Sequence, residues 1–116
     1  MNKKVAIFAF NGELMCFAHA LLNSQDMKEK GYDIKLIIEG SATKQIKELS
    51  DSTKPFANLY EKAKGSGLID CVCQACSSAN GSYESAKEQG LPICGEMSGH
   101  PSISRYRDEG YEVIVF

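Results

Sequence analysis

Three of the five cysteines lie close together near the middle of the chain, in the stretch LIDCVCQACSSANG. They are Cys71, Cys73 and Cys76. Strand-type residues precede them and small, helix-compatible residues follow, so a helix is expected to begin there. The positive end of a helix stabilises a thiolate, which is the reactive form of cysteine. We therefore predict Cys73, at the end of the strand, as a nucleophile and Cys76, in the first helical turn, as its partner.

Other uses of these cysteines stay open. Four thiolates from Cys71, Cys73, Cys76 and Cys94 would suit zinc, but structural zinc sites usually have two close pairs and this chain has one. The C-x-x-C of CQAC also fits a dithiol that exchanges with disulfides. Cys71 is expected to be buried and inert, since free cysteine often behaves as a small apolar residue. The whole cluster could likewise serve only in packing.

The chain shows a recurrent exit from helix to strand, in which a glycine is followed by an apolar residue at 31–32, 67–68, 90–91 and 110–111. The predicted strands are Lys4–Phe10, Asp33–Glu39, Leu68–Cys73, Leu91–Cys94 and Tyr111–Phe116. The runs VAIFAF and VIVF are apolar throughout, which is typical of parallel strands covered on both faces. The pattern predicts a three-layer α/β/α sandwich with a mostly parallel sheet of about five strands.

The longest predicted helix runs from about Glu13 to Lys30. Its apolar stripe is expected to contain Leu14, Phe17, Ala18, Leu21 and Leu22. Cys16 and His19 fall off this stripe and are expected to face solvent or another subunit. Shorter helices are predicted near 43–49 and 55–64, with two more beginning at Ser82 and Pro101.

Ligands of parallel sheets bind beyond the carboxyl ends of the strands. The loops expected there include 11–13, 40–43, 73–77 and 95–100. We accordingly predict Asn11, Glu13, Cys94 and His100 as binding residues, and expect the loop around His100 to be flexible. The loop after the first strand lacks the glycine-rich cradle for phosphates, so neither a nucleotide nor a flavin is expected.

The composition bounds the function classes. The 116 residues predict a single domain over 1–116, with 43% hydrophobic residues and a formal net charge of -2. The sequence contains no stripe of basic residues that would indicate nucleic-acid binding. It also contains no apolar run that approaches the length of a membrane-spanning helix. We expect a cytoplasmic protein whose cysteines stay as thiols rather than disulfides.

The segments CVCQACSSANG and EGYEVIVF, with the long helix after a first strand that has no nucleotide loop, resemble the DsrE/DsrF-like (DsrEFH-like) sulfur relay family, which includes the TusD-type carriers. The resemblance implies that Cys73, eight positions before Gly81, accepts sulfane sulfur as a persulfide. It also implies homotrimers or hexamers, and donor and acceptor proteins as partners. Family members often have an arginine where this chain has Asn80.

Together these observations predict a small sulfur carrier, a possible sulfurtransferase, that relays a persulfide sulfur to a partner thiol without a cofactor. The alternative is a non-catalytic, oligomeric binding module whose cysteines pack or chelate zinc.

Overall fold

The computed structural model describes residues 3–116 and contains one five-stranded sheet. Its strands are β1 (Lys4–Ala9), β2 (Asp33–Ile38), β3 (Ile69–Cys73), β4 (Ile93–Cys94) and β5 (Glu112–Val115). They are arranged in the order β4-β3-β2-β1-β5, and each neighbouring pair is parallel. The predicted α/β class and strand count are confirmed.

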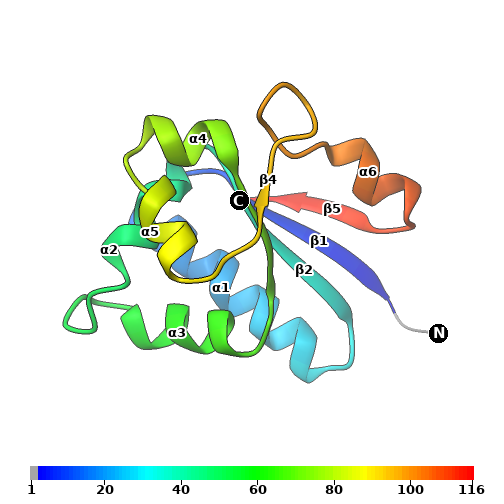
Figure 1. Ribbon diagram of the computed structural model, residues 1–116. Helices are drawn as coiled ribbons and strands as arrows, with labels where there is room; N and C mark the ends of the chain where they lie inside the picture. The colour runs from blue at the N-terminus through cyan, green and yellow to red at the C-terminus, as the bar shows by residue number, and fades with distance from the viewer. Residues whose placement is uncertain (1–2) are drawn as a thin grey trace.

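Helices cover the sheet unequally on its two faces (Figure 1). They are α1 (Leu14–Glu29), the 3₁₀ turn η1 (Gly40–Thr43), α2 (Lys44–Glu48), α3 (Ala57–Gly65), α4 (Gln74–Ala79), α5 (Tyr83–Glu88) and α6 (Ile103–Asp108). One face packs against the connections that contain α1 to α5, and the other packs against α6. The result is the predicted three-layer sandwich with one thin outer layer.

The order of the strands explains this inequality. From β1 to β4 each connection steps to the next strand in the same direction, so its helices lie on one face. The connection through α6 then returns across the sheet and places β5 on the other side of β1. The order in which strands are added to the sheet therefore changes direction at β1. Parallel sheets form their binding crevice beside such a switch point.

Helix α1 forms the largest part of the thick layer. Phe17, Ala18 and Leu21 are buried against the sheet, as their spacing predicts. The prediction that Leu22 belongs to this stripe is wrong, since 49% of its surface is exposed. At 100° per residue Leu22 lies beyond the contact with the sheet, and the buried Gln25 occupies the next turn instead.

Strand β5 differs from the prediction that it is covered on both faces. Ile114 is 37% exposed and Val115 is 57% exposed. The reason is position, because β5 is an edge strand and α6 covers only part of the face beside it. Its end is nonetheless fixed, since the backbone N–H groups of Phe10 and Asn11 both donate to the Phe116 carbonyl.

Across residues 3–116, no helix has the length and apolar character that a membrane crossing needs.

Candidate metal centre at the carboxyl edge of the sheet

Four side chains with metal-ligating atoms converge where three neighbouring strands end. Glu39 follows β2, Cys73 ends β3, Cys76 lies in the first turn of α4, and His100 lies in the loop after β4. Their ligand atoms all lie within 4.8 Å of one another. Because β4, β3 and β2 are adjacent and parallel, their carboxyl ends bring residues 61 positions apart in sequence to one point.

The two cysteines are positioned by the start of α4. Cys73 is the N-cap residue, and its Sγ accepts a hydrogen bond from the backbone N–H of Cys76 at 3.4 Å. Cys73 is fully buried, whereas Cys76 is partly exposed. Burial raises the pKa of the Cys73 thiol to about 12, although the Cys76 N–H opposes the shift. The expectation of an ionised, reachable Cys73 thiolate therefore differs from the structure, because burial outweighs the short helix.

His100 contacts both sulfur atoms. Its Nδ1 lies 3.2 Å from Cys73 Sγ and 3.5 Å from Cys76 Sγ. The loop that carries it is held rather than flexible, contrary to the prediction. The Ala75 N–H donates to the Gly99 carbonyl at 2.9 Å, and Met97 and His100 exchange two backbone hydrogen bonds. Gly99 has φ +93°, and a Cβ there would lie 3.2 Å from Ala75, so a glycine allows the loop to approach α4.

Glu39 completes the cluster and was missed by the sequence analysis. Its Oε2 lies 3.8 Å from His100 Nδ1, and its side chain is 12% exposed. Burial raises the pKa of this carboxyl, and the nearby His100 partly offsets the effect. A signal was available, since Glu39 directly follows the apolar end of β2 at the edge where the cysteines lie. Glu39 lies near the cysteines only because β2 pairs with β3, and this pairing cannot be predicted from the sequence.

The distances from His100 Nδ1 to the other ligand atoms are close to those of a tetrahedral metal site. With zinc-to-ligand distances of 2.0–2.3 Å, neighbouring ligand atoms should lie roughly 3.3–3.8 Å apart. Of the three separations that involve His100 Nδ1, those at 3.5 and 3.8 Å lie in this range and the one at 3.2 Å lies just below it. The remaining pairs lie within 4.8 Å. Two thiolates, an imidazole and a carboxylate form a donor set typical of zinc and related transition metals.

Cys71 and Cys94 lie outside this centre. They form a disulfide between β3 and β4, with their Cα atoms 5.8 Å apart. The burial predicted for Cys71 is confirmed, but the expectation that all cysteines are thiols is wrong. Cys94 accordingly links two strands instead of lining the centre. The pairing follows from the adjacency of β3 and β4, which places Cys94 directly beside Cys73 and within reach of Cys71.

Asn11 and Glu13, both predicted as binding residues, stabilise the start of α1 instead. The Asn11 Oδ1 accepts a hydrogen bond from the Glu13 N–H, and the Glu13 carboxylate accepts from the N–H groups of Met15 and Cys16. These bonds cap the free donors of the first helical turn. Their types and spacing suit capping as well as binding, and local contacts decide between the two.

Asn80 also has a structural contact of its own. Its Nδ2 donates to the Cys76 carbonyl at 2.9 Å and to Thr43 Oγ1 at 3.1 Å. These bonds fix the end of α4 against η1 and so hold the helix that carries Cys76. Cys16 and His19 lie on α1, partly exposed and exposed respectively, as the helical pattern predicts.

Comparison with known proteins identifies homologues in archaea. The chain is 35% identical to the uncharacterized protein MJ0733 of Methanocaldococcus jannaschii over 96 residues, which are 83% of this chain and 76% of that protein. The chain belongs to the family of this archaeal protein.

Two uncharacterized proteins of Archaeoglobus fulgidus match shorter segments. One is 56% identical over 43 residues (37% of this chain, 70% of that protein), and the other is 50% identical over 36 residues (31% and 97%). No family model matches the chain, and no solved structure matches it. The names of these relatives state no activity.

Proposed function

We propose that this protein binds a divalent transition metal of the zinc class through Glu39, Cys73, Cys76 and His100. The observation that carries the proposal is the convergence of their four ligand atoms within 4.8 Å. This is the binding module that the sequence left as its alternative, with Glu39 and His100 in place of Cys71 and Cys94.

The surroundings support a bound metal. Cys73 is buried, and within residues 3–116 its sulfur forms no hydrogen bond with a lysine or arginine, so a metal that replaces its proton would stabilise it. Four protein donors fill a tetrahedral shell, which is typical of structural zinc. The carboxylate is the hardest of the four donors, so Glu39 is the ligand that a thiol or imidazole would replace most readily.

Metal analysis of protein purified without chelators tests the proposal. We expect one zinc ion per chain, and a thiolate-to-cobalt charge-transfer band in the near ultraviolet after exchange with Co²⁺. Cys76→Ser and His100→Ala should each weaken the metal affinity by more than about tenfold, since each removes a ligand.

The chain provides matched controls on α1. Cys16→Ser and His19→Ala change the same residue types outside the cluster and should leave the metal content unchanged. A protein that takes up no stoichiometric metal, or controls that weaken binding as much as the cluster variants, would exclude the proposed centre.

A second candidate, the sulfur relay, is favoured by one observation, the partial exposure of Cys76 beside Cys73 and His100. In this reaction the Cys76 sulfur attacks the outer sulfur of a donor persulfide, R–S–SH. A new S–S bond forms on Cys76, the donor S–S bond breaks, and the donor leaves as a thiol after taking one proton. No net oxidation occurs, and an acceptor thiol on a partner protein takes the sulfur by the same exchange.

Intact mass after treatment with a sulfane-sulfur donor separates the two candidates. The relay predicts a gain of one sulfur atom on the metal-free protein that Cys76→Ser abolishes and Cys16→Ser retains. A mass that does not change, together with stoichiometric zinc, would leave metal binding alone.

A further inference from the structure

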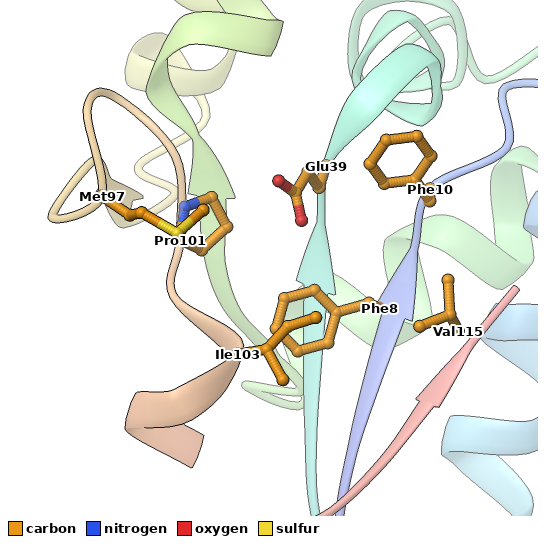
Figure 2. Close-up of a pocket in the computed structure, with 7 residues that line it drawn as sticks. All are labelled: Phe8, Phe10, Glu39, Met97, Pro101, Ile103 and Val115. Atoms are coloured by element: carbon orange, nitrogen blue, oxygen red, sulfur yellow. The ribbon is translucent and has the colours of Figure 1, made fainter. Parts of the chain in front are cut away.

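A mostly apolar cavity of about 380 Å³ adjoins the candidate metal centre. Its lining residues come from β1 and β5, the positions just after β1 and β2, the loop after β4 and the first residue of α6: Phe8, Phe10, Glu39, Met97, Pro101, Ile103 and Val115 (Figure 2). The volume falls in the range of about 300–1,000 Å³ that small-molecule pockets have. The cavity also lies at the carboxyl ends of β1, β2 and β5, beside the strand at which the strand order changes direction.

The cavity combines an apolar body with one charge. Phe8 and Ile103 form its inner wall, and Phe10 and Val115 lie on the side of β1 and β5 (Figure 2). Glu39 is the one charged residue among the seven in the lining, and its carboxylate points toward the cavity. A ligand that fits would therefore place apolar surface on the rings and a polar head at Glu39.

The charge of that head follows from the charge at Glu39. A mostly buried carboxylate is costly unless a donor or a cation satisfies it. Its one ionic partner among the described residues, His100, lies 3.8 Å away on the side of the metal centre. With zinc bound, two thiolates and the carboxylate exceed the charge of the ion by one, so the centre stays negative. Without zinc the carboxylate itself supplies one negative charge, so both states favour a cation.

We propose that this cavity binds a small apolar primary amine, with its ammonium group donating hydrogen bonds to Glu39 and its apolar body against Phe8 and Ile103. The ammonium would use the carboxylate oxygen that faces the cavity, which is the kind of second contact that metal-bound carboxylates commonly make. The inference goes beyond the metal centre and does not depend on it, since Glu39 provides the charge in either state.

The test uses three probes of one shape in NMR titrations of the isotope-labelled full chain, with and without added zinc. These are 2-phenylethylamine, 2-phenylethanol and phenylacetate. The amine should bind with a Kd of about 0.1–1 mM, as its size allows. It should bind about tenfold more tightly than the alcohol, because a charged hydrogen bond replaces a neutral one. The anion should not bind.

Substitutions in the lining test whether the amine binds in this cavity. Glu39→Gln should remove the preference for the amine over the alcohol, whereas Ile103→Trp should fill the cavity and abolish binding of both. Ile103 is 45% exposed and outside the metal ligands, so its variant should keep the metal content. Val115→Trp, at a 57% exposed position, provides the same test if the first variant does not fold.

The failures of the two proposals are distinguishable. Zinc binding with no preference for the amine, or with a preference that survives Glu39→Gln, would overturn this inference alone. Amine binding in a protein that takes up no metal would overturn only the metal centre. Shifts of the cavity residues that depend on protein concentration without a probe would show that a second copy of the chain covers the cavity, and would also overturn the inference.

Discussion

The two faces of the sheet are stabilised in different ways. The face covered by the connections with α1 to α5 has a large apolar core, in which Phe17, Leu21 and Leu36 are fully buried. The face covered by α6 has a small core around Phe8 and Tyr106, whose rings pack edge to face at 5.4 Å. A single six-residue helix cannot exclude water from five strands, so the second face needs other contacts.

Those contacts are covalent and polar. The Cys71–Cys94 disulfide lies on the α6 side, and the Tyr106 hydroxyl donates to Asp70. The Tyr111 hydroxyl donates to Asp33 at 2.9 Å. The thick layer therefore supplies stability through burial, whereas the thin layer leaves apolar surface free at the strand ends. That free surface forms the cavity beside Glu39.

The largest expected effect compares two phenylalanines on the two faces. Phe17→Ala removes a fully buried ring and should lower the free energy of unfolding by about 4 kcal/mol. Phe10→Ala removes a ring of the cavity wall that is 50% exposed and should cost less than about 1 kcal/mol. Urea unfolding followed by circular dichroism measures both. Equal losses would mean that the faces do not differ as described.

The disulfide should give the next largest effect. Its sequence separation of 23 predicts a stabilisation of about 3 kcal/mol from the shortened unfolded chain. Cys94→Ser should lose most of this amount in non-reducing urea unfolding, and Cys16→Ser, which changes a free cysteine, should lose little. A reducing agent should destabilise the parent and leave Cys94→Ser unchanged. If the parent does not respond to reduction, the second face does not depend on the cross-link.

The smallest expected effect is a pH dependence on the α6 side. Burial and the bond to Asp70 raise the pKa of Tyr106 well above its ordinary value near 10. Above about pH 10 the unfolded chain therefore releases a proton that the folded chain keeps, and stability falls as the pH rises. One such tyrosine contributes a slope of about 1.4 kcal/mol per pH unit, so Tyr106→Phe should flatten the curve by that amount. Identical slopes between pH 10 and 11 would contradict the buried, protonated hydroxyl.

The sequence predicted the architecture because the signals for it are local. Apolar runs and the glycine exits located all five strands, and the spacing of Phe17 and Leu21 located the buried face of α1. What it could not supply was the lateral order of the strands. The same apolar residue types are buried in β1, near the centre of the sheet, and exposed in β5, at its edge.

The parts of the candidate site that depend on local signals were predictable, and the parts that depend on strand order were not. The placement of Cys73, Cys76 and the His100 loop at one edge is confirmed, since strand ends of a parallel sheet meet there. Glu39 as a fourth donor and the pairing of Cys71 with Cys94 both depend on which strands are neighbours. Asn11 and Glu13 show a different limit of the sequence pattern, since polar residues near a strand end can also cap the next helix.

The strand order also decides where a foreign strand could extend the sheet. The two outer borders are unequal, since β4 has only two residues and is cross-linked to β3, whereas β5 has four. Backbone groups along the outside of β5 have no neighbouring strand within residues 3–116, and Ile114 and Val115 add exposed apolar surface there. Aggregation by strand addition would therefore start at β5, and Ile114→Lys is the substitution with which to suppress it.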